Sequence, residues 1–172
     1  MSLCVAFPPA ARADARCLIL GSLPGVESLR LGQYYGHRRN AFWPIMGELA
    51  GADPGLPYQA RLAKLNGAGF ALWDVCASAT RPGSLDADIR DLIPNDFRRF
   101  LHEHRTIALI CFNGQTAAKL FERYVAPGLP EELGKIARKT LPSTSPAHAA
   151  MRFDQKLALW RAALTPPAAG RR

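Results

Sequence analysis

The sequence predicts an α/β domain built around a parallel β-sheet. Four short apolar segments, at residues 17–20, 70–75, 107–112 and 137–141, recur along the chain, and stretches with helical periodicity separate them. This alternation is typical of βαβ units. The first three segments are almost continuously apolar, as expected for strands that are covered by helices on both faces of a sheet.

Each predicted strand has turn-forming residues or helical patterns at its ends. The first strand, CLIL, stops at Gly21, and a helix at 41–49 follows after a polar, aromatic and basic segment. A helix at 58–65 comes before the turn signal at 66–69 and the second strand. Helices at 96–104 and 115–124 flank the third strand, and a long helix at 146–164 follows the weaker fourth strand.

Length and composition fit one globular domain. A chain of 172 residues that is 48% hydrophobic is long enough to bury a core. We expect the domain to span residues 1–165 and the Pro-rich, basic tail at 166–172 to be disordered. No apolar run approaches the roughly 20 residues that cross a bilayer, and the N-terminus has no signal-peptide pattern. We therefore expect a soluble, cytoplasmic protein, and we take a monomer as the default state.

The net charge of +8 suggests a polyanionic partner such as nucleic acid, because Lys and Arg that neutralise phosphates release counterions. Solubility alone is the alternative explanation of that charge. The four cysteines form no CxxC pair, which argues against a zinc or iron–sulfur site. The sequence also lacks GxGxxG and P-loop motifs. We therefore expect no metal and no cofactor.

Polar and turn-forming residues follow all four predicted strands. Right-handed crossovers bring the exits of parallel strands to one edge of the sheet, where open α/β sheets bind ligands. The segments that should meet there are 21–25, 74–81, 113–114 and 142–148. The first segment allows close backbone approach to a base or a phosphate, although an ordinary turn has a similar sequence. Its candidate base-binding residues are Gly21, Ser22, Leu23 and Pro24.

The segment at 33–43 combines basic, aromatic and amide side chains. Arg38 and Arg39 suit contacts with phosphates, and His37 is either a DNA contact or a surface histidine. Tyr35 and Phe42 suit contact with a flipped base. An aromatic residue at a helix start, such as Phe42, is also a common core residue.

An amide and a carboxylate in these segments suit chemistry on a base. Asn40 is either the N-cap of the next helix or the group that positions a reacting water. Asp74, at a strand end, is either a loop cap or an acceptor for an N–H of an extruded base. Asn113 is either part of an Asn-Gly turn or a second base contact. We expect Arg81 to contact DNA.

The residues after the fourth strand suit a phosphate. Ser143, Thr144 and Ser145 precede the predicted start of the last helix, where hydroxyls and backbone amides bind anions. His148 is either a ligand contact or a surface residue. Arg152 is a further basic candidate for contact with DNA.

Together, the segments GSLPG, YYGHRRNAFW, LWDV with RPGSLD, FNG and LPSTSPAHA resemble the uracil-DNA glycosylase superfamily. They are most similar to its hypoxanthine-DNA glycosylase (deoxyinosine glycosylase) family, over residues 16–160. The resemblance implies a three-layer αβα fold with a central four-stranded parallel sheet and an active site at the strand exits. It also implies that Asn40 is the catalytic residue.

Several positions depart from the patterns of the superfamily. Many members carry Asp or Asn inside the first motif, where this chain has Leu23, and uracil-specific enzymes carry His where this chain has Leu141. Both differences disfavour efficient uracil excision. In the hypoxanthine family we would expect Pro in place of Arg38 and Asn in place of His148.

These observations predict a base-excision repair enzyme that flips hypoxanthine out of double-stranded DNA and hydrolyses its glycosidic bond. Asn40 positions the water in this hypothesis, and Asp74 accepts the base N1–H. The site segments contain no lysine, so we expect a monofunctional enzyme without a Schiff-base step. The alternatives are a uracil or broad-range deaminated-base glycosylase, a non-catalytic DNA-binding module, and a small-nucleotide enzyme.

Overall fold

The computed structural model describes residues 2–83 and 85–165, and the expected tail at 166–172 lies outside them. Its central sheet has four parallel strands in the order β3-β2-β6-β7. These strands are β2 (Cys17–Gly21), β3 (Phe70–Asp74), β6 (Leu109–Asn113) and β7 (Ala137–Leu141). The predicted α/β class and the four predicted strands are therefore confirmed.

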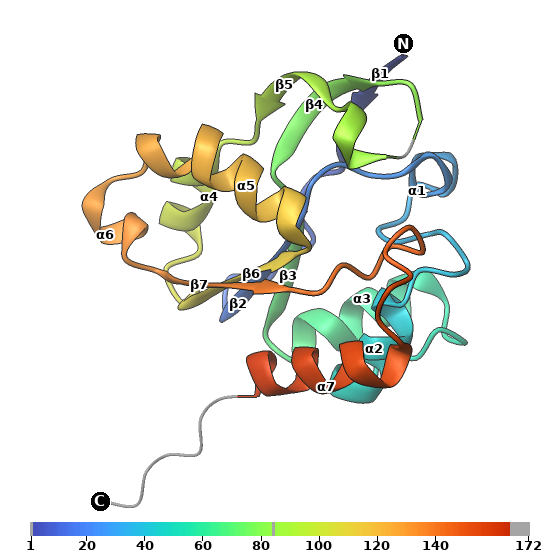
Figure 1. Ribbon diagram of the computed structural model, residues 1–172. Helices are drawn as coiled ribbons and strands as arrows, with labels where there is room; N and C mark the ends of the chain where they lie inside the picture. The colour runs from blue at the N-terminus through green and yellow to red at the C-terminus, as the bar shows by residue number, and fades with distance from the viewer. Residues whose placement is uncertain (1, 84, 166–172) are drawn as a thin grey trace, which may run out of the picture.

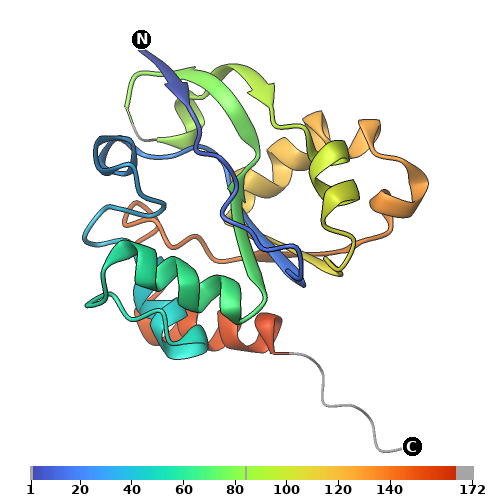
Figure 2. The same ribbon diagram turned by 180° about the vertical axis from the view of Figure 1, so that it is seen from behind.

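Helices cover both faces of this sheet, so the fold has the three layers that the family resemblance implies (Figure 1). One face is covered by α2 (Phe42–Ala50), α3 (Tyr58–Gly67) and α7 (Phe153–Leu164). The other is covered by α4 (Phe97–Glu103), α5 (Gln115–Tyr124) and the short α6 (Glu131–Gly134), with a 3₁₀ turn η2 (Ala126–Gly128) between the last two. Figure 2 shows the same layers from behind.

Alternate residues of β2 point into two hydrophobic cores. Leu18 and Leu20 belong to the core that contains Phe97 and Phe121 of the α4–α5 face. Ile19 belongs to the core that the α2, α3 and α7 helices build on the opposite face. Since a strand shows successive side chains to opposite faces and both faces are covered, every position is apolar. The continuous apolar pattern of this segment follows directly.

A second, antiparallel sheet in the order β1-β4-β5 lies beside the first. Its strands are β1 (Ser2–Val5), β4 (Cys76–Arg81) and β5 (Arg90–Pro94). The sequence does not predict this sheet, because its strands are only partly buried and rich in small and polar residues. The loop expected to lead from Arg81 into a helix cap instead holds a 3₁₀ turn, η1 (Asp86–Asp88), and then enters β5.

Two further helix boundaries differ from the prediction. A short helix, α1 (Val26–Leu31), follows the GSLPG segment. The last helix begins at Phe153 rather than at 146, so residues 142–152 form an irregular loop. Pro142 and Pro146 and the three hydroxyl residues between them favour turns over helix there. Among the described residues, none of the helices combines the length and apolar character needed to cross a membrane.

Candidate active site

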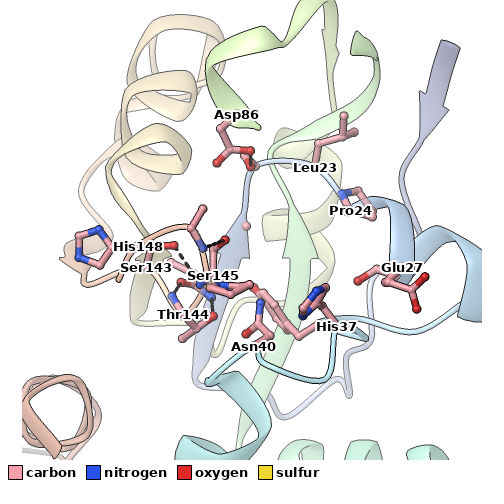
Figure 3. A pocket seen from close by; sticks show the side chains of 18 of the residues that line it. Leu23, Pro24, Glu27, His37, Asn40, Asp86, Ser143, Thr144, Ser145 and His148 are labelled. Carbon is pink, nitrogen blue, oxygen red and sulfur yellow. Dashed lines mark hydrogen bonds between the residues drawn. The ribbon is translucent and has the colours of Figure 1, made fainter. Parts of the chain in front are cut away.

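A cavity of about 330 Å³ opens at the carboxyl ends of the central strands (Figure 3). All four strand-exit segments contribute to its wall. In Figure 3, Asp86 and Leu23 lie on one side, and Asn40 and His37 lie across from them. The predicted site residues that line the cavity are Gly21, Ser22, Leu23, Pro24, Tyr35, His37, Asn40, Asp74, Asn113, Ser143, Thr144, Ser145 and His148.

Gly21, Asp74 and Tyr35 meet at the floor of the cavity. A Cβ atom on Gly21 would lie 2.6 Å from Asp74 Oδ1 and 3.3 Å from the Tyr35 hydroxyl oxygen, so glycine makes room for both groups. Within the described residues, neither the Tyr35 hydroxyl nor Asp74 Oδ2 has a hydrogen-bond partner, although both atoms are buried. Buried polar atoms normally have partners. A water or a ligand that enters the cavity can supply these partners.

Tyr35 has an unusual backbone conformation, and its ring packs against Phe42. Its φ of 54° lies in the left-handed region, which is uncommon for a bulky residue and often found at functional sites. The ring stacks on Phe42 with a centroid distance of 4.0 Å. Phe42 is 0% exposed and does not line the cavity. This corrects the expected base contact of Phe42, which is a core residue that supports Tyr35 from behind.

The Asp74 carboxyl has an environment that disfavours its charged form. The residue is only 4% exposed. Burial raises the pKa of Asp74 to about 7, the negative charge of Asp86 adds to this rise, and the Arg81 guanidinium opposes it. A carboxyl group that titrates near neutral pH inside a cavity is typical of a functional site.

Asn40 is fixed by its own segment. Its Oδ1 accepts a hydrogen bond from the Phe42 backbone N–H at 3.0 Å, and its own backbone N–H donates to the His37 carbonyl at 2.9 Å. The side chain thereby caps the start of α2 from one residue before the N-cap position, Ala41. In the part of the chain that the structure describes, Nδ2 has no acceptor, so this donor remains for a water or a substrate.

Asn113 holds the backbone of the neighbouring segment. Its Nδ2 donates to Thr144 Oγ1 at 2.8 Å, and its Oδ1 accepts from the Thr144 backbone N–H at 2.9 Å. Asn113 therefore supports the backbone at Thr144, while the second N–H of its Nδ2 is not used by these two hydrogen bonds and can still contact a base. The Thr144 carbonyl accepts from the Ala41 N–H at 2.9 Å. Thr144 thus connects the Asn40 segment to the end of β6.

The segment at 143–148 is a loop of turns. The Ser145 N–H donates to Ser143 Oγ at 3.2 Å, and the His148 N–H donates to the Ser145 carbonyl at 3.0 Å. Because α7 begins only at Phe153, its first amides do not belong to these serines. The expected helix-start anion site is therefore corrected to a loop of hydroxyls and backbone amides, with the exposed His148 at its end.

The four predicted arginine contacts with DNA are placed in two ways. Arg38, Arg39 and Arg152 are exposed and lie outside the cavity lining, and Arg152 forms an ion pair with Asp154 at 3.1 Å. Arg81 is 1% exposed, and its guanidinium donates to the Pro24 carbonyl. This burial contradicts the expected DNA contact of Arg81. Its guanidinium instead holds the loop that follows β2.

Asp86 is a cavity residue that the sequence pattern does not reveal. Its Oδ1 accepts a hydrogen bond from Ser22 Oγ at 2.6 Å and lies 3.6 Å from Arg81 Nη1. The available signal was the Pro82-Gly83 turn between an Arg and an Asp, which fits a β-hairpin as well as a helix cap. Among the described residues, no group of three or more His, Cys, Asp or Glu side chains is arranged to hold a metal ion.

Comparisons with known proteins agree with this architecture. The sequence model that defines the uracil DNA glycosylase superfamily matches residues 8–164 of this chain. Proteins named hypoxanthine DNA glycosylase from Methanosarcina barkeri and Methanosarcina acetivorans are each 39% identical over 114 residues, which cover 66% of this chain and 72% of the relative. The solution structure of a candidate uracil DNA glycosylase from Methanosarcina acetivorans matches with a TM-score of 0.77 and 33% identity, over 94% of this chain and 98% of that one.

The sequence and structural matches extend over the sheet, the helices and the cavity segments alike. The superfamily match covers every strand of the central sheet and every cavity residue. The resemblance that the motifs suggested is thereby confirmed. The chain belongs to the uracil DNA glycosylase superfamily and is, by that membership, a DNA glycosylase.

Proposed function

We propose that this DNA glycosylase removes hypoxanthine from deoxyinosine in double-stranded DNA, as a cytoplasmic monomer that leaves an abasic site. The names of both Methanosarcina relatives support this substrate. The observation that carries the proposal is the cavity floor, where the Tyr35 hydroxyl and Asp74 Oδ2 are buried without partners among the described residues. Hypoxanthine offers an N1–H donor and a C6 carbonyl acceptor, which complement such groups.

DNA is held by the positive charge of the protein and by the loops around the cavity. The net charge of +8 favours binding to phosphates. Arg38 and Arg39 are exposed directly beside Asn40, and Ser143 and Ser145 line the cavity from the adjoining loop. Phosphate contacts from these residues position the strand so that one nucleotide turns into the cavity. Flipping costs a few kcal/mol and least for a weakly paired base, which favours inosine over normal pairs.

Bond cleavage follows from the position of the base and of Asn40. As the C1′–N9 bond lengthens, its electron pair moves to the base and the sugar becomes oxocarbenium-like. The Asn40 Nδ2 donates a hydrogen bond to the oxygen of a water that attacks C1′, and the water loses its proton to solvent. An amide is a weak base, but attack on a cationic carbon needs little prior deprotonation, so orientation is its main contribution.

A second candidate is a broad-range glycosylase for deaminated bases. Uracil and xanthine also carry an N–H next to a carbonyl, so the pair of polar groups on the cavity floor suits them as well. Leu23 lines the cavity at the first motif, where it offers no polar group to a water. This difference favours hypoxanthine over uracil within the same fold.

The decisive experiment measures single-turnover base release from duplexes that carry one deoxyinosine, one deoxyuridine, one deoxyxanthosine or no lesion. We expect release of hypoxanthine by the wild type and its loss in Asn40→Ala with DNA binding retained. The control is Gln59→Ala, which removes an exposed amide on α3.

Each other outcome points to a different conclusion. Fast cleavage by Asn40→Ala would make Asn40 structural. Faster release of uracil than of hypoxanthine would favour the broad-range candidate. Salt-sensitive duplex binding without release from any lesion would identify a non-catalytic DNA-binding module.

A further inference from the structure

The cavity holds two carboxyl groups with opposite surroundings. Asp86 accepts a hydrogen bond from Ser22 at 2.6 Å and lies 3.6 Å from the guanidinium of Arg81, with a side chain that is 40% exposed. Asp74 is 4% exposed and its Oδ2 has no partner among the described residues. Two carboxyl groups in one site commonly divide into an ionised and a neutral member in this way.

We propose that Asp74 acts on the flipped base as a neutral carboxylic acid, and that Asp86 is the positioning residue that keeps Asp74 protonated. This inference rests on the proposed function of the cavity. It assigns a proton to a specific atom of the site and gives a role to Asp86. Asp74 would touch the base, whereas Asp86 acts through Asp74.

The neutral form of Asp74 is favoured first by burial. An ionised carboxylate that is buried without a hydrogen-bond donor costs several kcal/mol, so the group takes up a proton instead. Burial raises the pKa of Asp74 to about 7. The same effect raises the pKa of Asp86, but there the Ser22 hydrogen bond and the Arg81 charge oppose it. Burial still raises the pKa of Asp86 overall, but the Ser22 donor and the Arg81 charge stabilise its ionised form.

Asp86 matters because the positive charge of Arg81 acts on both carboxyl groups. The guanidinium of Arg81 lowers the pKa of Asp74, whereas the negative charge of Asp86 raises it. Without Asp86, the buried guanidinium would act on Asp74 alone and favour its ionised form. The titratable groups that interact with Asp74 come from three elements, namely Tyr34 and Tyr35 after α1, Cys76 and Arg81 on β4, and Asp86 on η1.

A neutral Asp74 fits the charge that develops during the reaction. The departing hypoxanthine takes the electron pair of the C1′–N9 bond, and its negative charge spreads to the C6 oxygen. An ionised carboxylate beside that oxygen would repel it. A carboxylic acid donates its O–H to the oxygen and accepts N1–H with its other oxygen, an interaction that strengthens in the transition state. The proton remains on Asp74 throughout, so the acid is unchanged after each turnover.

The test is the pH profile of single-turnover hypoxanthine release between pH 6 and 8. With a pKa of about 7 for Asp74, the neutral fraction and therefore the wild-type rate should fall about ten-fold across this range. Asp74→Asn retains a neutral N–H donor that does not titrate, so its profile should be flat. Asp86→Asn should begin its decline at lower pH, and Asp86→Glu should restore the wild-type profile.

The matched control is Asp88→Asn, which removes the same charge from the same 3₁₀ turn outside the cavity lining and should follow the wild type. All variants act on the same substrate, so titration of inosine itself is common to every curve. A flat wild-type profile, or superposition of the Asp86→Asn and wild-type profiles, would overturn the inference. Absence of hypoxanthine release by the wild type at every pH would instead refute the proposed function.

A direct measurement tests the proton on Asp74 independently of any activity assay. The infrared difference spectrum between the wild type and Asp74→Asn should contain the C=O stretch of a protonated carboxyl at pH 6, and this band should be lost by pH 8. A carboxylate band at both pH values would show that Asp74 is ionised and would contradict the proposal.

Discussion

Replacement of Gly21 by alanine tests how closely the cavity floor is fitted. The added Cβ would lie 2.6 Å from Asp74 Oδ1, whereas ordinary contact begins at 3.4 Å, so the carboxyl must move by about 0.8 Å. Asp74 is buried at the end of β3, directly across from Gly21 in the sheet register, and has little room to turn aside. A displacement near 1 Å at a reacting group can cost on the order of 100-fold in rate. Overpacking of this kind also destabilises a fold by about 1–3 kcal/mol.

The assay compares single-turnover release of hypoxanthine with unfolding in urea. We expect Gly21→Ala to remain folded at 25 °C, to bind duplex DNA, and to release the base between ten- and a hundred-fold more slowly, in line with the order of magnitude for a 1 Å displacement. Gly67→Ala is the matched control, because Gly67 ends α3 and a Cβ there meets nothing within 4 Å. Its unfolding free energy should rise by about 0.5–1 kcal/mol, since alanine loses less chain entropy than glycine. A Gly21→Ala enzyme as fast as the wild type would refute the reasoning that Asp74 is held against Gly21.

Four further substitutions probe the electrostatics, the supporting hydrogen bonds and the contacts with DNA. Asp74→Asn should be more stable than the wild type at neutral pH. The pKa of Asp74 is raised from 3.8 to about 7 in the folded state, so the folded protein binds more protons over that range and loses up to about 4 kcal/mol of stability as the pH rises through it. Urea unfolding at pH 4 and pH 8 checks this, and an equal difference between variant and wild type at both values would contradict it. Asn113→Ala removes both hydrogen bonds to Thr144 and should lower the unfolding free energy by about 1–3 kcal/mol, measured by urea denaturation. Arg38→Ala and Arg39→Ala should each reduce the slope of log binding constant against log salt by about 1 if they contact phosphates, and an unchanged slope would place them off the DNA.

The central sheet was predictable because its strands are buried on both faces. Residues 17–20 and 107–112 show continuous apolar runs, which are typical of strands buried on both faces. The convergence of the strand exits follows from the handedness of the crossovers alone. The strand-exit segments of the cavity were therefore accessible from the sequence, including Gly21 and Asp74, whereas Tyr35 was a candidate because of the basic and aromatic composition of residues 33–43.

The second sheet and the place of Arg81 were not accessible in the same way. The strands β4 and β5 carry small and polar residues whose burial depends on β1 and on the cavity loop. A charged residue such as Arg81 is expected at the surface, and only the tertiary fold reveals the carbonyl and the carboxylate that hold it inside. Asp86 was missed for the same reason, because its neighbours come from distant parts of the chain.

Thr144 connects the serine loop, which is proposed to bind DNA, to the segment that carries Asn40. Its side chain and N–H are fixed by Asn113, and its carbonyl is bound to Ala41, the neighbour of Asn40. In the proposed mechanism, a phosphate bound by the adjoining serines is therefore held at a fixed distance from the Asn40 amide. That distance is set by the fold before any DNA binds. A DNA strand whose backbone does not match it should bind without losing its base, so the proposed mechanism makes backbone shape a requirement separate from the identity of the base.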